Sequence, residues 1–306
     1  MARRITLIVV GVLVLALAVA YLVPTPRADP DELYAEVDDA TVASLRGFRA
    51  TRPVQQVAVG EHTWEYVVAG DGPTTVLFLH GMGGAYDIWW QQIEALEATH
   101  RVVAPTYPAV PSLDGLADGL LTILDTEGID EVAVVGSSLG GYLAQYLVQH
   151  HPDRVSHAVF SNTFPPNDLL RAEYGVLGSL IPYLPEWVVL FAFRFNSVRE
   201  VVPASEGSPL VEAYLREQGH GAMSKAQFNA RYRAVIDPLQ VADPEPDGIP
   251  LLIIEADNDP LIAAELREEL VRLYPTAEVY TFHGAGHFPY LNRPDEYTAL
   301  LRDHLG

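Results

Sequence analysis

The sequence of 306 residues contains no cysteine, which excludes disulfide bonds, a thiol nucleophile and cysteine-ligated metal sites. Basic residues are also scarce, because 19 Lys and Arg stand against 40 Asp and Glu, and Lys225 is the only lysine. The formal net charge of −21 argues against a nucleic-acid partner, whose phosphates would be repelled. The chain also lacks a phosphate-binding loop, a dinucleotide fingerprint and a metal-ligand cluster, so we expect no cofactor and no metal.

Residues 136–140 read Gly-Ser-Ser-Leu-Gly, a G-x-S-x-G pattern with Ser138 at its centre. An apolar run, 131–135, comes directly before it, and a helix-like segment, 139–146, begins within it. Between a strand and a helix, the central serine of this pattern stands on a tight, strained turn, and the glycines let the neighbouring backbone pass. We therefore predict that Ser138 is a nucleophile for acyl transfer, placed at a helix N-terminus where negative charge is favoured.

A second glycine-rich loop, residues 80–84, reads His-Gly-Met-Gly-Gly and follows the apolar strand 75–79. Glycines at such a turn let backbone N–H groups point into a cavity. We predict that the backbone N–H groups of Met82 and Leu139 form an oxyanion hole, a role worth about 3 kcal/mol for each donor. We expect His80 itself to be structural.

Three carboxylates, Glu255, Asp257 and Asp259, crowd the exit of the long buried strand 249–256. We predict that Asp259 orients the catalytic imidazole and stabilises its charged form, because the Pro-Leu-Ile that follows marks the turn toward a helix. Asp257 is the alternative acid. A carboxylate here would also suit the start of the next helix, since the helix dipole favours it.

His287 lies in the segment Gly-Ala-Gly-His-Phe-Pro, residues 284–289, after a predicted strand. We predict that it takes the proton from Ser138 and later returns it, with its second ring nitrogen bound to Asp259. The glycines give this loop the reach that the role needs. His283, nearer the strand, is the alternative base.

These motifs follow the chain order serine, aspartate, histidine, and together they resemble the α/β-hydrolase superfamily over residues 54–305. Residues 140–145 and 273–291 look most like its maspardin branch. The resemblance implies a serine hydrolase with the three side chains named above as its catalytic triad. Members of that branch can lack a complete triad, whereas all three residues stand at the matching positions here.

Short β-rich runs between amphipathic segments predict a mostly parallel sheet with helices on both faces. The resemblance implies that residues 51–306 adopt the α/β-hydrolase fold. An antiparallel pair opens the sheet, and the active site is expected at the carboxyl ends of the strands. The segment of about 163–247, after the sixth strand, has no strand pattern and is therefore predicted to form an inserted helical cap. Its apolar run, residues 181–193, would either line a substrate pocket or pack the cap onto the main domain. The predicted strands are 54–59, 63–68, 75–79, 101–104, 131–135, 155–161, 249–256 and 277–282.

The N-terminal residues 5–23 carry no charge, and as a helix about 28 Å long they would match a hydrocarbon core of about 30 Å. Arginines before the run and acidic residues after it predict one N-terminal transmembrane helix within residues 1–23 and an extracytoplasmic, membrane-anchored catalytic domain. A signal sequence cleaved after Ala18-Val19-Ala20, giving a secreted enzyme, is the alternative. Residues 24–50 would then form a tether and a juxtamembrane helix.

The sequence as a whole therefore predicts a serine hydrolase that cleaves small or lipid-like carboxylic esters through an acyl-enzyme. A carbon-carbon bond hydrolase, an amidase or a perhydrolase would use the same residues. A maspardin-like binding or adaptor protein without turnover is the alternative from a different class. The expected partners are the small-molecule or lipid-like ester and, through the N-terminal helix, the membrane.

Overall fold

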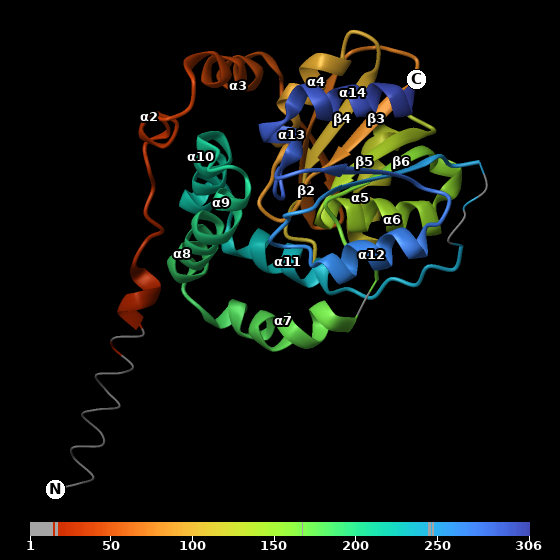
Figure 1. The fold of residues 1–306 in the computed structure, drawn as a ribbon. Helices are drawn as coiled ribbons and strands as arrows, with labels where there is room; N and C mark the ends of the chain where they lie inside the picture. Colours follow the sequence, from red (N-terminus) through yellow and green to blue (C-terminus); the bar gives the residue numbers. More distant parts are fainter. Residues whose placement is uncertain (1–14, 16–17, 167, 244–245, 247) are drawn as a thin grey trace, which may run out of the picture.

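An eight-stranded, mostly parallel sheet forms the centre of the computed structural model, which describes residues 15, 18–166, 168–243, 246 and 248–306 (Figure 1). The strand order is β1-β2-β4-β3-β5-β6-β7-β8, with antiparallel pairing of β2 to both β1 and β4 and parallel pairing elsewhere. The predicted mostly parallel sheet with an antiparallel opening pair is present. The strands are β1 (Gln55–Val59), β2 (His62–Ala69), β3 (Thr75–Leu79), β4 (Arg101–Thr106), β5 (Val132–Ser137), β6 (Val155–Ser161), β7 (Leu251–Ala256) and β8 (Glu278–Phe282).

Alternate residues of the central strands face opposite sides of the sheet and enter two separate hydrophobic cores. In β3, Val76 and Phe78 belong to one core, whereas Leu77 and Leu79 belong to the other. Because both faces are covered, these strands are apolar throughout and do not alternate with polar residues. Continuous apolar runs in the sequence are therefore the signature of this sheet.

Helices cover both faces, as Figure 1 shows. The helices of the α/β body are α3 (Asp39–Thr51), α4 (Trp90–Leu96), α5 (Leu113–Thr126), α6 (Leu139–His150), α12 (Ala264–Leu273), α13 (Pro289–Asn292) and α14 (Pro294–Leu305). The first core takes side chains from α3, α4, α13 and α14, and the second takes them from α5, α6 and α12. The sheet is thus the middle layer of three.

Between β6 and β7 the chain forms a helical insertion, residues 168–235, and the described part of this stretch contains no strand. In Figure 1, α8, α9 and α10 form one group and α7 lies apart below them. The elements are α7 (Asp168–Leu180), η3 (Ile181–Tyr183), α8 (Glu186–Asn196), η4 (Ser197–Val201), α9 (Val202–Ala204), α10 (Pro209–Glu217), η5 (Gln218–Ala222) and α11 (Lys225–Val235). A helical insertion was expected at this place.

Arg49 of α3 and Tyr34, which directly follows α2 (Pro30–Leu33), connect the insertion to the body. Arg49 binds Asp87 through Nε at 2.6 Å and holds both carboxylate oxygens of Glu217 in α10 at 2.9 and 2.8 Å. Tyr34 donates a further hydrogen bond of 2.6 Å to Glu217. A bidentate, half-buried pair of this kind fixes geometry as well as adding stability.

The structure contradicts the prediction of an N-terminal transmembrane helix and, with it, the predicted membrane-anchored localisation. Most of residues 5–23 lies outside the described residues, and in the described part of the chain no helix is long and apolar enough to cross a membrane. Residues 18–22 are helical. They lie against the insertion, because Trp187 Nε1 donates to the Ala20 carbonyl at 2.8 Å and the Tyr21 hydroxyl donates to the Tyr183 carbonyl.

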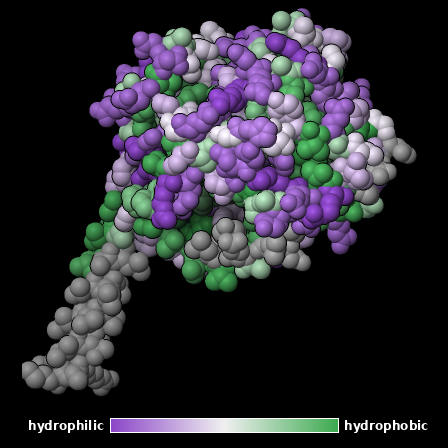
Figure 2. Space-filling view, in the orientation of Figure 1, coloured by the Kyte–Doolittle hydropathy of each residue, from purple (hydrophilic) through white to green (hydrophobic). Residues whose placement is uncertain are grey.

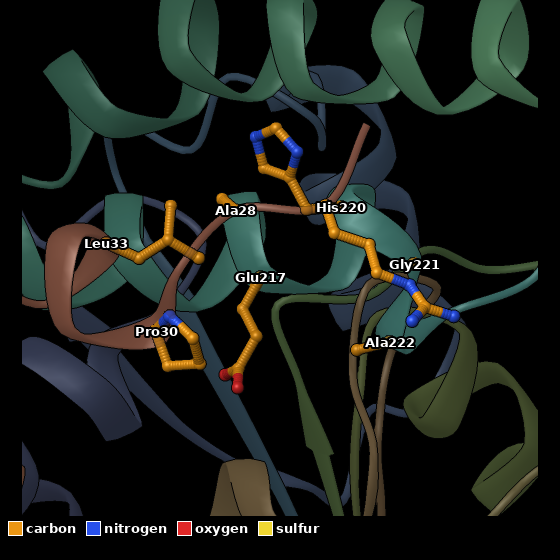
Figure 3. Close-up of a pocket in the computed structure, with 8 residues that line it drawn as sticks. Ala28, Pro30, Leu33, Glu217, His220, Gly221 and Ala222 are labelled. Carbon is orange, nitrogen blue, oxygen red and sulfur yellow. The ribbon is translucent and has the colours of Figure 1, made fainter. Parts of the chain in front are cut away.

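The face of the molecule seen in Figure 2 is mostly hydrophilic, but apolar side chains gather on it near residues 18–23 and along the lower edge of the insertion. A cavity of about 240 Å³ lies between residues 27–33 and the segment 217–222 (Figure 3). None of the predicted site residues lines this cavity. The candidate site therefore has to be sought elsewhere, at the carboxyl edge of the sheet.

Candidate active site

Ser138 is the single residue between β5 and α6, and its backbone is strained. Its φ of 56° and ψ of −120° lie where residues other than glycine are uncommon. Its N–H donates to the Ser161 carbonyl at 3.0 Å, and its own carbonyl accepts from Thr163 Oγ1 at 2.7 Å. These bonds from the neighbouring strand hold the tight turn that the sequence predicted, at the N-terminus of α6.

The glycines around Ser138 are required by close backbone contacts. A Cβ atom on Gly136 would lie 2.1 Å from the carbonyl oxygen of Gly140. A Cβ atom on Gly140 would lie 2.1 Å from the carbonyl oxygen of Leu79. Since backbone atoms cannot move aside cheaply, any larger residue at either position would push α6 away from the sheet.

The structure brings the predicted acid and base together. Nδ1 of His287 lies 2.8 Å from Oδ2 and 3.0 Å from Oδ1 of Asp259. Asp259 follows β7 and His287 follows β8, and these neighbouring parallel strands end at the same edge of the sheet. Both residues are buried, with 7% of Asp259 and 2% of His287 exposed.

Three further donors surround the Asp259 carboxylate. The Leu261 and Ile262 amides bind Oδ1 at 2.9 and 3.3 Å, and Asn162 Nδ2 binds Oδ2 at 3.0 Å. Burial by itself would raise the pKa of Asp259, but the charge and hydrogen bond of His287, with the bonds from Asn162 and Leu261, hold it below the ordinary 3.8. The carboxylate is therefore ionised at neutral pH and able to stabilise a charged imidazole.

The alternative acid and base, Asp257 and His283, pair with each other at the surface. His283 Nδ1 lies 2.8 Å from Asp257 Oδ2, and the two side chains are 83% and 47% exposed. The amide of Gly284 also binds Asp257, and this bond together with the one to His283 lowers the pKa of Asp257. The structure thus separates a buried pair from an exposed pair on the same two loops.

The predicted oxyanion donors belong to the loop 80–84 and to the first residue of α6, and neither N–H has an acceptor among the residues that the structure describes. A Cβ atom on Gly81 would sit 3.0 Å from Cβ of Ser138, so the loop 80–84 is in contact with the nucleophile turn. Leu139 is the first residue of α6, and its N–H therefore has no acceptor within the helix. Within the described residues, the Met82 N–H has no acceptor either.

His80 has a structural role, as expected. Its Nδ1 lies 2.7 Å from the Gly81 carbonyl, and its Nε2 accepts from the Tyr107 N–H at 3.2 Å. These partners fix the neutral tautomer, with Nδ1 donating and Nε2 accepting. Burial and the nearby charge of Arg231 lower the pKa of His80 well below 6.5, so the ring stays neutral.

The arrangement supplies the parts of acyl-transfer chemistry, although no hydrogen bond joins Ser138 to His287 among the contacts of the described residues. Such contacts are often loose before substrate binds and tighten in the complex. One edge of the sheet carries a hydroxyl at a helix N-terminus, an imidazole bound at Nδ1 and two amide N–H groups that have no acceptor among the described residues. Among the described residues, no cluster of three or more His, Asp or Glu side chains could hold a metal ion.

Comparison with known proteins assigns the family. A model of the α/β hydrolase fold family matches residues 74–294. The chain belongs to the α/β-hydrolase fold family. Maspardin from Mus musculus is 27% identical over 271 residues, which cover 84% of this α/β-hydrolase and 85% of maspardin. The predicted resemblance to the superfamily, and to its maspardin branch, is confirmed.

Solved structures of a hydrolase and of a phospholipase share the fold of this chain. A hydrolase from Pseudomonas aeruginosa PA01 superposes with a TM-score of 0.72 at 21% identity, over 83% of this chain and 98% of its own. A bacterial membrane phospholipase A superposes with a TM-score of 0.66 at 22% identity, over 99% of this chain and 98% of its own.

Asn162, which directly follows β6 in this α/β-hydrolase, was not among the predicted site residues. Its Nδ2 donates to Asp259 and also to the Gly286 carbonyl at 3.2 Å, and its Oδ1 accepts from Ser161 Oγ at 3.2 Å. Its φ of 43° is left-handed, a conformation that asparagine tolerates better than most residues. Its place at the carboxyl end of a strand was the signal that could have revealed it.

A second missed residue is Arg231 of α11, which is 1% exposed and reaches the loop 80–84. Nothing in the helical pattern of the insertion distinguishes Arg231 from Arg233 on the same helix. Only the tertiary structure shows which of the two is buried.

Proposed function

We propose that this α/β-hydrolase is a serine hydrolase that cleaves small or lipid-like carboxylic esters. The observation that carries the proposal is the buried Asp259–His287 pair, which lies at the same sheet edge as the strained turn of Ser138. A buried, hydrogen-bonded carboxylate beside an imidazole is what a general base needs for orientation. A turn at Ser138 that served only packing would require neither the buried carboxylate nor the imidazole.

In the proposed mechanism, Ser138 Oγ attacks the ester carbonyl carbon while Nε2 of His287 takes the hydroxyl proton. The oxyanion of the tetrahedral intermediate accepts hydrogen bonds from the Met82 and Leu139 amides. His287 then gives its proton to the leaving alcohol, and the acyl-enzyme forms. Water repeats the same steps on the acyl-enzyme and releases the carboxylic acid, with Asp259 stabilising the imidazolium in both halves.

Apolar side chains of the insertion favour an ester with an apolar acyl group. A Cβ atom on Gly83, in the proposed oxyanion loop, would lie 2.9 Å from Phe193 and 3.1 Å from Leu215. Both side chains come from the insertion, so substrate at the loop would meet apolar atoms there. The likeness to a membrane phospholipase A over 99% of the chain adds support for a lipid-like ester.

Labelling with a fluorophosphonate probe tests the proposal in the full-length protein. We expect wild type to be labelled and to hydrolyse nitrophenyl esters, with a preferred acyl length, and we expect Ser138→Ala and His287→Ala to lose both activities. A folded wild-type protein that neither reacts with the probe nor hydrolyses any ester of the series would contradict the proposal.

Similarity to maspardin supports a second candidate, a binding protein that keeps the fold without turnover. The same labelling experiment separates the two, because a binding protein would retain its fold in Ser138→Ala and show no labelling in wild type. Amide and thioester analogues of the preferred ester would show whether the protein acts as an amidase. Peroxide with a carboxylic acid would test for perhydrolase activity, and a vinylogous diketone would test for carbon-carbon bond cleavage.

A further inference from the structure

The side chain of Arg231 in the insertion ends beside the proposed oxyanion loop. Its Nη1 donates to the carbonyl oxygens of Met82 at 2.8 Å and Gly84 at 2.9 Å. Its Nη2 donates to the carbonyl oxygen of Tyr107 at 3.1 Å. One side chain of the insertion therefore fastens two backbone loops of the α/β body, and without it three carbonyls would lose a donor.

These contacts hold the backbone on both sides of the Met82 N–H. The peptide unit that carries this N–H also contains the Gly81 carbonyl, which accepts from His80 Nδ1 at 2.7 Å and from the Gly84 N–H at 3.2 Å. The next peptide unit contains the Met82 carbonyl, which Arg231 binds. Because each peptide unit is planar, fixing both carbonyls fixes the direction of the N–H between them.

Arg231 carries a charge that no anion balances. Among the residues that the structure describes, no carboxylate forms an ion pair with it, and only 1% of the residue is exposed. Burial lowers the pKa of Arg231 to about 10, so the guanidinium is still charged at neutral pH. A buried cation without an anion is costly. In the proposed reaction, an anion forms beside this loop only as the tetrahedral intermediate develops.

We propose that Arg231 is a positioning residue for the oxyanion hole: it fixes the Met82 N–H and places a positive charge behind the loop on which negative charge develops. The inference rests on the proposed function, because that function makes the Met82 N–H an oxyanion donor. Arginine suits the role since its planar fork meets three carbonyls at once, which the single ammonium group of lysine does not match. Contacts already made before the reaction need no reorganisation during it.

Variants of Arg231 in the full-length protein separate this role from simple packing. Arg231→Met removes the donors and the charge but keeps a long side chain, whereas Arg231→Lys keeps the charge and a single ammonium group but loses the planar fork. Gln227→Ala is the matched control, because Gln227 lies on the same helix and binds the Tyr107 carbonyl at 3.1 Å but not the loop 80–84. We expect kcat of Arg231→Met to fall by about 10²-fold with little change in KM, the size seen on loss of one oxyanion donor. Arg231→Lys should be intermediate, and Gln227→Ala should keep the wild-type kcat.

Two measurements, inhibitor affinity and amide hydrogen exchange, should change in the Arg231 variants only if Arg231 acts on the oxyanion hole. A trifluoromethyl ketone, which forms a tetrahedral oxyanion on the serine, should lose affinity in proportion to kcat, whereas the unfluorinated ketone should not. Amide hydrogen exchange in residues 80–84 should accelerate in Arg231→Met and stay unchanged in Gln227→Ala. A folded Arg231→Met with wild-type kcat, ketone affinity and exchange would overturn the inference and leave the proposed function standing. A wild-type protein without turnover or labelling would overturn the proposed function itself, and with it the assignment of the Met82 donor.

Discussion

Two aspartate–histidine pairs join the loops after β7 and β8, and they differ in burial and not in distance. Nδ1 of His287 and Nδ1 of His283 each lie 2.8 Å from a carboxylate oxygen, of Asp259 and of Asp257 respectively. The side chains of the first pair are 3% and 0% exposed, whereas those of the second are 83% and 47% exposed. Contact distance alone therefore does not identify the pair that is suited to catalysis.

Burial changes what such a pair can do. An exposed ion pair is screened by water and contributes about 0 to 1 kcal/mol, and its side chains remain free to turn away. The buried pair is instead fixed by neighbours, because Asn162 and two backbone amides bind Asp259. The candidate site therefore provides orientation by surrounding donors, and not only proximity.

The largest difference is expected between the two histidines. His287→Ala should lower kcat for the preferred nitrophenyl ester on the order of 10⁶-fold, because the general base and acid are lost together. His283→Ala should keep the wild-type rate, since its ring lies 83% exposed at the surface. Steady-state kinetics on both variants, with circular dichroism to show that each is folded, make the test. Similar losses in the two variants would contradict the assignment of His287.

The two aspartates should differ by a smaller factor. Asp259→Asn keeps the shape of the side chain but removes the charge that fixes the imidazole, so kcat should fall about 10⁴-fold. Asp257→Asn should leave kcat unchanged, because it alters only the exposed pair. Kinetics on the two variants in parallel check this. A loss confined to Asp257→Asn would make Asp257 the acid, the alternative that the sequence left open.

The sequence was most informative where a local pattern is tied to one backbone geometry. Thr75–Leu79 and Val155–Ser161 were predicted as strands with the bounds that the structure has. The apolar runs are unbroken because both sheet faces are covered. The glycines at 136 and 140 indicated the turn at Ser138, because no side chain fits at these two positions.

Sequence reasoning failed where the answer depends on three-dimensional surroundings. Arg231 could not be identified, because the carbonyls that it binds come from loops more than a hundred residues away. Asn162 was overlooked because its partner, Asp259, lies on the loop after another strand, β7. The N-terminal transmembrane helix was predicted from the hydropathy and length of one segment and from the charges beside it, and no helix of the described residues supports it.

Asn162 offers a way to weaken the buried pair without breaking it. Asn162→Gly removes the bond to Asp259 and still allows the φ of 43° at this position. A hydrogen bond to a charged group is worth about 1.5 kcal/mol or more, so kcat should fall about tenfold while KM stays the same. Asn258→Ala is the control, because Asn258 binds the Gly286 amide on the histidine loop but not Asp259. An equal loss in the control would mean that Asn162 acts through the loop and not through the acid.

The smallest expected difference is in acid stability. The pKa of Asp259 is held below 3.8 in the folded protein, so the folded state binds this proton less readily than the unfolded chain. Its contribution to the free energy of unfolding is therefore present above the unfolded pKa and is lost as the pH falls through the folded pKa. The pKa of Asp257 is lowered as well, but this carboxylate is exposed and salt screens its interactions.

Urea unfolding at a series of pH values between about 6 and 3, at low and high salt, measures these contributions. The fall in unfolding free energy toward low pH should be less steep in Asp259→Asn than in wild type at both salt concentrations, because the buried carboxylate is screened little. For Asp257→Asn, the slope should differ from wild type only at low salt. If the slopes of Asp259→Asn and wild type are equal, the pKa of Asp259 is not lowered by its neighbours, and the contrast between the buried and exposed pairs does not hold.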